Sequence, residues 1–276
     1  MSALLETAPL GSPLLGPEDP APFTIIDAAV PPRSNFPGPV LLVCDHAGRA
    51  VPKCLGDLGV PPAEMERHVA YDIGAAAVTR LLAAAWGAPA VLATYSRLVL
   101  DLNRQLDDPT AMPEISDGTV VPANRGCGAA ELRRRGQALH VPYHGAVDGQ
   151  IMAALAAGQA PAVISMHSMT PVMRGVARPW HISVLWDRDG RIAEPLMANL
   201  RAQGLVVGDN EPYSGRDHHG FTVETHCTPR GLPNVLIELR QDLVATEAGQ
   251  QEWAERLLRA FAPILSDPAL YRLPQL

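Results

Sequence analysis

Ala162–Pro171, AVISMHSMTP, is the stretch of this chain that most clearly indicates its fold. Residues 162–166 form a short apolar run, which is typical of a strand buried on both faces of a sheet. His167 and Ser168 follow in a predicted loop at the strand's carboxyl end, where open α/β sheets bind ligands. A single histidine there is equally compatible with a core residue bonded to a backbone carbonyl. Its role therefore depends on which other strand ends converge on it.

Apolar runs and helical patterns alternate along the rest of the chain. Strands are predicted at 23–26, 40–44, 90–94, 96–104, 181–186 and 234–240, with a possible strand at 221–223. Helices are predicted at 61–68, 73–86, 129–158 (interrupted near Pro142), 192–203 and 246–265. Residues 107–127 are rich in proline and glycine and are predicted to form a long loop that covers a site. This alternation predicts an α/β fold, a three-layer α/β/α sandwich with a mixed, mostly parallel sheet.

Composition limits the class of protein. The 276 residues are 47% hydrophobic and carry a formal net charge of −7, which supports a packed core and gives no basic surface for nucleic acid. No apolar run reaches the roughly 18 residues that a membrane span needs. The four cysteines, Cys44, Cys54, Cys127 and Cys227, lack metal-finger spacing, which favours reduced thiols and a cytoplasmic protein.

The chain contains no repeat and no Gly/Ser linker, so residues 23–276 are predicted to form a single α/β domain. Residues 1–22 hold several prolines and are predicted to be a flexible N-terminal arm. The oligomeric state does not follow from the sequence, because no exposed apolar stripe stands out.

Two other predicted strands carry chemically active side chains. One is followed by Asp45-His46-Ala47-Gly48, and Glu238 interrupts the last apolar run. A buried carboxylate is costly unless it is paired or lies near a metal. Glu238 could face outward on an edge strand, or pair with Arg240 or Arg97. We favour a general base beside a zinc site, because two imidazoles and one carboxylate leave zinc an open position for water.

A series of motifs between about residues 40 and 262 has the order found in a known family. The motifs are Asp45-His46-Ala47-Gly48 with Pro52, Asp72-Ile73-Gly74, Ser96-Arg97-Leu98, Asp101-Leu102-Asn103-Arg104, Pro142-Tyr143-His144, His167-Ser168-Met169-Thr170-Pro171, Arg178-Pro179-Trp180-His181, Asn210-Glu211-Pro212-Tyr213 and Ile237-Glu238-Leu239-Arg240-Gln241-Asp242. In these motifs the chain resembles the N-formylglutamate amidohydrolase family, which is similar in turn to the zinc metallocarboxypeptidases. The resemblance implies a phosphorylase/hydrolase-like fold and one zinc ion (Zn2+) per chain.

The resemblance also implies roles for individual residues. His46 takes the place of the first zinc ligand, His167 matches the later histidine ligand, and Glu238 lies in the stretch that holds the catalytic glutamate. Carboxypeptidases have a glutamate ligand three residues after the first histidine, where this chain has Arg49. Asp72 is the candidate for the missing metal ligand, although an aspartate at a predicted helix start is equally well explained as an N-cap. Asp45 is the alternative, but its side chain should leave the strand on the face opposite that of His46.

Three further residues are predicted to bind the substrate. Asn103 and Arg104 match the carboxylate-binding Asn-Arg pair of the carboxypeptidases, and Arg97 lies in the same predicted strand. Guanidinium groups bind carboxylates through paired hydrogen bonds, so these side chains suit an N-acyl amino acid. Each arginine could instead form a salt bridge, for example with Asp101. Arg174 and Arg178, beyond His167, could bind a second carboxylate.

The remaining histidines give weaker indications. His140 and His144 have the spacing of a helical zinc pair, but Pro142 lies between them, so a capping or supporting role is favoured. His218-His219 is predicted at the surface. His226 and Tyr213 lie in a loop that could close over substrate.

The sequence thus predicts a metal-dependent amidohydrolase whose single catalytic domain converts a small carboxylated amide, such as N-formyl-L-glutamate, to formate and the free amino acid. Neither nucleic acid nor membrane is an expected partner. One alternative is a deacylase or peptidase that acts on another carboxylated amide. The other is a non-catalytic small-molecule binding protein of the same fold, which Arg49 favours.

Overall fold

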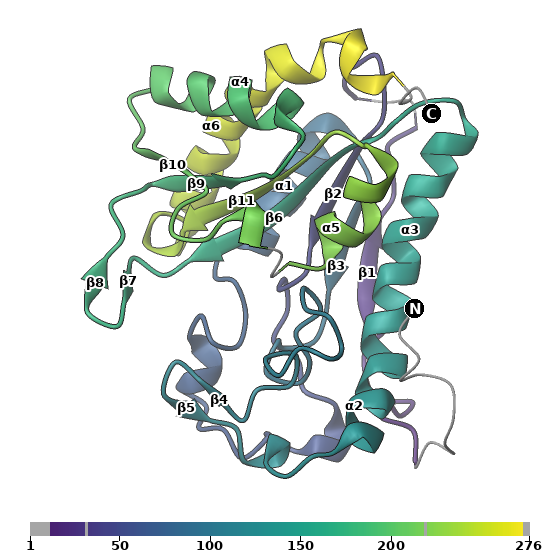
Figure 1. The fold of residues 1–276 in the computed structure, drawn as a ribbon, viewed down its shortest axis with the longest axis vertical. Coiled ribbons are helices and arrows are strands. Elements are labelled where there is room, and N and C mark those ends of the chain that lie inside the picture. Colours follow the sequence, from purple (N-terminus) through teal and green to yellow (C-terminus); the bar gives the residue numbers. More distant parts are fainter. Residues whose placement is uncertain (1–11, 31–32, 218–219, 273–276) are drawn as a thin grey trace.

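The computed structural model describes residues 12–30, 33–217 and 220–272. These residues form a central seven-stranded sheet with the strand order β1-β3-β2-β6-β11-β9-β10 (Figure 1). Its strands are Phe23–Ile26 (β1), Val40–Cys44 (β2), Ala90–Ala93 (β3), Ala162–Met169 (β6), Ile182–Leu185 (β9), Val207–Asp209 (β10) and Asn234–Arg240 (β11). Short hairpins outside the sheet consist of Ile115–Ser116 (β4) with Thr119–Val120 (β5) and Val172–Met173 (β7) with Val176–Ala177 (β8).

The sheet is mixed and mostly parallel, as predicted. Strands β3, β2, β6 and β11 run parallel to one another in its centre. Strand β1 is antiparallel to β3 at one edge, and β9 is antiparallel to β11 on the other side, with β10 parallel to β9. Because the central strands share one direction, their carboxyl ends meet at one edge of the sheet.

Helices cover both faces of the sheet. The first face packs against Ala75–Trp86 (α1), Gly190–Ala202 (α4) and Glu247–Leu265 (α6). The second packs against Val141–Ala156 (α3), which continues from Ala129–Arg135 (α2) through a π-helical turn at Gly136–His140. A short helix, Thr222–His226 (α5), precedes β11.

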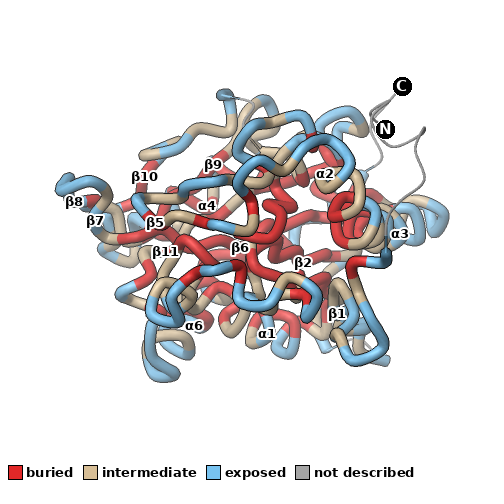
Figure 2. Tube along the Cα trace, turned by 90° about the horizontal axis from the view of Figure 1, so that it is seen from below, coloured by how far each residue is buried: buried red, intermediate tan, exposed pale blue. Residues whose placement is uncertain are grey.

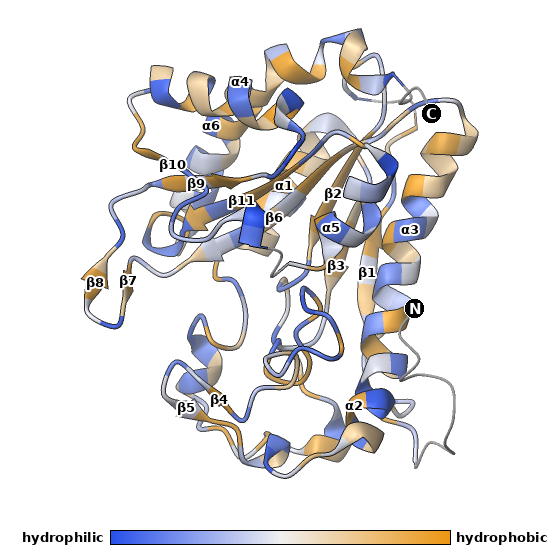
Figure 3. Ribbon diagram, in the orientation of Figure 1, coloured by the Kyte–Doolittle hydropathy of each residue, from blue (hydrophilic) through white to orange (hydrophobic). Residues whose placement is uncertain are grey.

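Two apolar cores fill the spaces between the layers. Alternate residues of β2 belong to opposite cores: Leu42 and Cys44 to one, Leu41 and Val43 to the other. Figure 2 shows the buried central strands between helices whose outer sides are exposed, and Figure 3 shows the same strands as mainly hydrophobic. The predicted three-layer α/β/α architecture is confirmed.

The interruption predicted near Pro142 corresponds to the π-helical turn at Gly136–His140. Proline has no backbone N–H, so the ordinary helical bond cannot form at residue 142, and the wider turn lies directly before it. Helix α6 begins as the sequence suggests, with the Thr246 hydroxyl accepting a hydrogen bond from the N–H of Gly249.

The strand predicted at 96–104 is wrong, because these residues form successive turns. The Ser96 hydroxyl donates to the carbonyl oxygen of Ala70 and accepts from the N–H of Leu98, and the N–H of Val99 bonds the Ser96 carbonyl oxygen. Such local bonds compete with a strand ladder. The apolar side chains of this segment are buried in the second core without strand pairing.

Three smaller predictions also differ from the structure. Residues 61–68 contain only a 3-10 turn at Glu64–Glu66. Residues 221–223 enter helix α5, because the side-chain oxygen of Asn103 accepts bonds from the N–H groups of Phe221 and Thr222. Strand β6 extends to Met169, so His167 and Ser168 lie within it, paired with β11, rather than in a loop.

The predicted arm, residues 1–22, is described from residue 12 onward. This part lies against the domain: Leu14 is buried, and the carbonyl oxygen of Pro20 accepts a hydrogen bond from the Tyr95 hydroxyl. Among the described residues no helix combines the length and apolar character needed to cross a bilayer.

Candidate metal centre and active site

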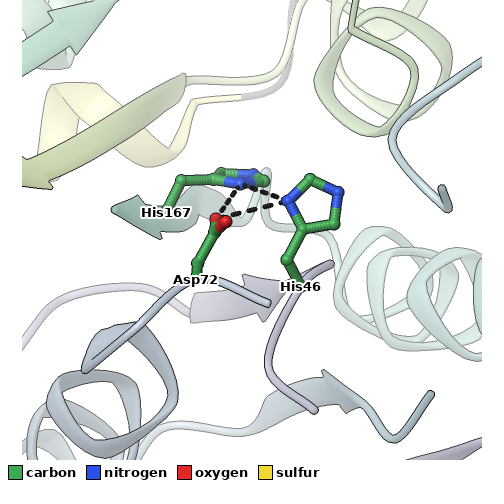
Figure 4. A group of neighbouring side chains, drawn as sticks. All are labelled: His46, Asp72 and His167. Atoms are coloured by element: carbon green, nitrogen blue, oxygen red, sulfur yellow. Dashed lines mark hydrogen bonds and ion pairs between the residues drawn. The ribbon is translucent and has the colours of Figure 1, made fainter. Parts of the chain in front are cut away.

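Three side chains from distant parts of the chain meet at the carboxyl ends of the central strands (Figure 4). They are His46, Asp72 and His167, and all three are buried. The Nδ1 atoms of the two histidines are 3.2 Å apart, and Asp72 Oδ2 lies 3.2 Å from Nδ1 of His46 and 2.8 Å from Nδ1 of His167. Two imidazole nitrogens and a carboxylate oxygen are a donor set that binds divalent cations. This group could hold a metal ion.

The backbone geometry explains why His46, Asp72 and His167 lie close together. Strands β2 and β6 are parallel neighbours, with Val43 opposite Ser165, so the chain just after β2 reaches the level of His167. A Cβ on Gly48 would clash with the carbonyl oxygen of Thr94, which explains why the turn after His46 has glycine there. The N–H of Asp72 donates to the carbonyl oxygen of His46 and fixes the third segment beside the first.

Asp72 is not the N-cap of helix α1. The N-cap is Gly74, whose φ of 80° lies in the left-handed region that glycine adopts without strain. This turn frees the Asp72 carboxylate, which instead contacts the two histidines and lies 3.3 Å from the N–H of Ser168. The sequence allows Asp72 to be either a metal ligand or an N-cap. In the structure it lies with the two histidines, as the first interpretation requires.

A second set of carboxylates contacts the outer nitrogens of the two histidines. Nε2 of His46 lies 2.7 Å from Asp101 Oδ1, and Nε2 of His167 lies 3.0 Å from Asp45 Oδ2. A carboxylate only accepts hydrogen bonds, so each Nε2 carries a proton and, in a neutral ring, Nδ1 presents a lone pair. Two lone pairs and an ionised carboxylate then face one another, an arrangement that a cation bound between them would stabilise. Carboxylates behind the histidines in this way are typical of metal ligands.

The charges around the histidines favour the same conclusion. Burial and the charge of Arg97 would lower the pKa of His46, but Asp101 and Asp72 outweigh them and raise it. Burial would likewise lower the pKa of His167, but Asp45 and Asp72 hold it well above its usual value. Burial opposes ionisation of the three aspartates, yet the histidines, with Arg97 beside Asp101, lower their pKa values. The field at this point therefore attracts cations.

Glu238 lies beside this group in the middle of the sheet. Its strand, β11, lies between β6 and β9, and Glu238 is directly opposite His167 in the register. The alternatives suggested by the sequence are not found: β11 is not an edge strand, Arg240 pairs with Asp242, and Arg97 pairs with Asp101. In the described part of the chain its carboxylate has no hydrogen bond or salt bridge. Burial raises the pKa of Glu238 to about 7, although the nearby histidines act in the opposite direction.

A cavity of about 1050 Å³ opens in front of these residues. It is lined by His46, Asp72, His167 and Glu238. It is also lined by the three predicted substrate-binding residues, Arg97, Asn103 and Arg104, and by Arg178 and Tyr213. The volume exceeds that of a small amino-acid derivative and is in the usual range for ligand sites.

Comparison with protein-family models matches residues 38–245 to the N-formylglutamate amidohydrolase family. The chain belongs to this family. The match spans the three-residue group, Glu238 and the cavity arginines.

Two solved structures are similar to this chain in fold. A gene product of Agrobacterium tumefaciens is 36% identical, with a TM-score of 0.85 over 92% of this chain and 98% of that chain. An N-formylglutamate amidohydrolase from Ralstonia eutropha is 23% identical, with a TM-score of 0.61 over 89% of this chain and 97% of that chain, and shows that the fold is shared. A comparison with curated proteins gives no match.

In this family member, Arg49 is kept away from the metal group. It pairs with Glu66, and its guanidinium carbon lies 5.2 Å from the centre of the Tyr71 ring. Asp72, from a later segment, occupies the third place at the centre instead. Asp45, the alternative ligand, contacts the outer nitrogen of His167 and so lies on the far side of that ring from His46.

The predicted substrate-binding residues also have structural contacts. Nη2 of Arg97 donates to Asp101 Oδ2 at 2.5 Å, and Nη1 lies 3.7 Å from Asp72 Oδ1. The side-chain oxygen of Asn103 accepts hydrogen bonds from the backbone N–H groups of Phe221 and Thr222 at the start of α5. Nε of Arg104 donates to the Thr110 hydroxyl at 3.2 Å.

Sequence reasoning missed the roles of Asp101 and Asp45 as partners of the histidines. Asp101 lies in the Asp-Leu-Asn-Arg motif and was considered only as a salt-bridge partner for arginine. Its contact with His46 depends on the folded turns at 96–104, for which the sequence predicted a strand. The adjacent Asp45-His46 pair was the available signal for Asp45.

The other histidines support the cavity wall. His140 Nε2 lies 3.2 Å from the carbonyl oxygen of Arg104, and His144 Nε2 lies 2.8 Å from that of Leu102. His144 Nδ1 is 3.1 Å from Nε2 of His226. These rings hold the segment that carries Asn103 and Arg104, a supporting role as the sequence suggested. His218 and His219 lie outside the described residues.

Proposed function

We propose that this chain is a zinc-dependent amidohydrolase that cleaves an N-acyl amino acid, with N-formyl-L-glutamate as the expected substrate. His46, Asp72 and His167 would hold one zinc ion per chain. The observation that carries the proposal is the convergence of two imidazole Nδ1 atoms and a carboxylate oxygen, backed by Asp101 and Asp45, beside a glutamate with no partner among the described residues. Family membership supports the reaction class.

A zinc ion held by His46, Asp72 and His167 would supply a Lewis acid, which would polarise an amide carbonyl and make water a stronger nucleophile near neutral pH. Glu238 accepts the proton of the attacking water as the new C–O bond forms. It then delivers that proton to the nitrogen as the C–N bond breaks, which releases formate and the free amino acid. A pKa of about 7 suits a group that must first accept and then donate a proton at neutral pH.

The cavity arginines orient the substrate. Arg97 and Arg104 line the cavity, and the side-chain oxygen of Asn103 fixes the start of α5 by accepting its backbone hydrogen bonds. We assign the α-carboxylate of the substrate to this side of the cavity. A carboxylate bound here would hold the amide in one position relative to Glu238. This lowers the activation barrier, because the substrate loses its translational and rotational freedom on binding, before the reaction begins.

The test measures metal content and substrate together. The purified protein should contain about one zinc per chain and should release formate from N-formyl-L-glutamate, and chelation should abolish release until zinc is restored. A protein that binds no divalent metal and hydrolyses no member of a panel of N-formyl and N-acetyl amino acids would support the non-catalytic binding alternative. Hydrolysis confined to N-acetyl or longer acyl groups would support the deacylase alternative.

A further inference from the structure

Arg178 lies on the cavity wall with most of its side chain buried. It is 7% exposed, in the segment between β8 and β9, and it lines the cavity that His167 and Glu238 also line. Its Nη2 donates to the Tyr213 hydroxyl oxygen at 2.7 Å, and Nη1 lies 3.4 Å from the carbonyl oxygen of Thr170. The guanidinium carbon is 4.9 Å from the centre of the Tyr213 ring.

The contacts of Arg178 differ from those of other arginines in the cavity. Arg97, Arg188 and Arg191 each pair with a carboxylate of the chain. The contacts of the Arg178 guanidinium are to neutral oxygens, and the residues that the structure describes include no carboxylate paired with it. A buried guanidinium without a counter-charge is costly. An anion bound in the cavity would remove that cost.

Tyr213 completes a carboxylate-binding pair. Its hydroxyl oxygen accepts the hydrogen bond from Arg178, so its own proton remains free to be donated. It is 41% exposed and lies on the same cavity wall. A guanidinium edge and a neighbouring hydroxyl donor together match the two oxygens of a carboxylate.

The place of Arg178 along the chain suits the far end of an acidic amino acid. Thr170, whose carbonyl oxygen Arg178 contacts, is three residues beyond His167, or about 10 Å along an extended chain. In an extended N-formylglutamate the formyl carbon and the side-chain carboxyl carbon are about 6 Å apart, from ordinary bond lengths and angles. The remaining few ångströms equal the reach of a metal–oxygen contact at one end and a hydrogen bond at the other.

We propose that Arg178 and Tyr213 form the subsite for the side-chain carboxylate of the substrate. They thereby set a preference for N-acyl amino acids with acidic side chains over those with neutral ones. The proposal rests on the proposed function and adds to it the class of side chain that the enzyme accepts. It assigns the side-chain carboxylate of the substrate to Arg178 and Tyr213, whereas the α-carboxylate is assigned to Arg97 and Arg104.

The kinetic test compares N-formyl-L-glutamate with N-formyl-L-glutamine, which has nearly the same shape but no side-chain charge. Arg178→Gln should reduce the ratio of the two kcat/KM values by about 10- to 100-fold, because a hydrogen-bonded charge pair is lost for the glutamate substrate alone. Tyr213→Phe should reduce it by a smaller factor, and Arg178→Lys should be intermediate.

The matched control is Arg174→Asn. The substitution removes an arginine charge four residues from Arg178. The Arg174 side chain is exposed and does not line the cavity, and the φ of 50° at residue 174 is one that asparagine tolerates. The ratio should be unchanged in this variant. Equal loss on both substrates in Arg178→Gln would overturn the proposal, because it would show a structural role or a role in binding the α-carboxylate.

A binding measurement separates this proposal from the reaction itself. In chelator-treated protein, calorimetry should show tighter binding of N-formyl-L-glutamate than of N-formyl-L-glutamine, and Arg178→Gln should remove the difference. If the wild type hydrolyses neither compound, the proposed function fails, whereas this difference in binding would still support the subsite. If the metal-free wild type binds both compounds equally, the subsite is wrong even where hydrolysis is observed.

Discussion

His46 and His167 turn their Nδ1 atoms toward each other because Asp101 and Asp45 engage the opposite nitrogens. At the scale of single residues, this orientation determines what the centre can do. It fixes the position of each ring and makes the inner nitrogens electron-pair donors. Glu238, one strand away, has no such partner among the described residues and keeps a carboxylate that can exchange a proton.

Glu238→Gln should leave metal binding intact and reduce kcat by at least about 100-fold, because the amide cannot accept the proton of the attacking water. Zinc content and formate release, measured on the same preparation, check this. Glu255→Gln, on the exposed side of α6, is the matched control and should have wild-type activity. Full activity in the Glu238 variant would remove its assigned role.

Asp101→Asn should weaken zinc binding by about 10- to 100-fold, as expected when the carboxylate behind a histidine ligand is neutralised. Competition with a chromophoric chelator measures the change. Asp57→Asn, at an exposed turn, makes the same chemical change away from the centre and should not alter the affinity. Unchanged affinity in Asp101→Asn would mean that His46 is not a metal ligand.

At the scale of elements, the segment before helix α1 decides whether Asp72 reaches the histidines. Gly74 turns the chain with a positive φ and packs against the carbonyl group of Val244, in the segment that leads to α6. The turn releases Asp72 from the role of N-cap. The position of one metal-centre residue therefore depends on a glycine two residues further along the chain.

Gly74→Ala should lower the free energy of unfolding by about 1 to 3 kcal/mol, since the new Cβ meets both an unfavourable φ and the backbone of Val244. It should also weaken zinc binding, because Asp72 shifts. Urea denaturation and chelator competition measure the two effects. The control, Gly149→Ala on the exposed side of α3, has open space around its Cβ and should stabilise the protein by about 0.5 to 1 kcal/mol. A Gly74 variant as stable as the wild type would contradict this account.

The strands that form the centre of the sheet could be predicted from sequence, and other segments could not. Residues 40–44 and 234–240 are short apolar runs in a buried sheet, and hydrophobic pattern alone determines them. The segment 96–104 has a similar pattern, but its apolar side chains are buried by surrounding loops while Ser96 bonds the local backbone. The start of α5 depends on Asn103, more than 100 residues earlier, and no local pattern contains that information.

The residues of the candidate site also divide into those that the sequence predicts and those that it does not. His46, His167 and Glu238 could be predicted because they follow or interrupt apolar runs whose ends must meet in a parallel sheet. The role of Asp101 could not be predicted, because its contact with His46 requires the turns of 96–104, where the sequence pattern indicates a strand. An aspartate just before a helix suits both a metal ligand and an N-cap, and the positive φ of Gly74, which makes Gly74 the N-cap, decides between them.

At the scale of the whole molecule, a group of buried histidines joins the helical segment that leads into α3, helix α5 and the end of the turns of 96–104. Burial lowers the pKa of His140 to about 4 and that of His144 to about 3, and it also lowers the pKa of His226. Protonation would place charge at these buried positions and would remove the lone pair that the bond between His144 and His226 needs. Acid should therefore loosen the contact between the helices and the wall that carries Arg104.

Stability should fall as pH decreases from about 6.5 to about 4. In that window the unfolded histidines take up protons, whereas His140 and His144 in the folded protein do not, so protonation favours the unfolded state. Each such residue contributes a slope of about 1.4 kcal/mol per pH unit. Unfolding of chelator-treated protein should show that this slope is smaller by about that amount in His144→Gln than in the wild type. Equal slopes in the two proteins would mean that His144 is not buried in its neutral form.

The pairing of Glu238 with His167 across two hydrogen-bonded strands has a consequence for how such enzymes can be altered. His167 and Glu238 are held by the hydrogen-bonded strands of the sheet, whereas Arg178 lies in the connection between β8 and β9. Exchange of the connection between β8 and β9 would change which acylated compounds are accepted while His167 and Glu238 stay in register. A designer seeking a new substrate should therefore alter this connection first and keep both the sheet and the turns that carry Asp72 and Asp101.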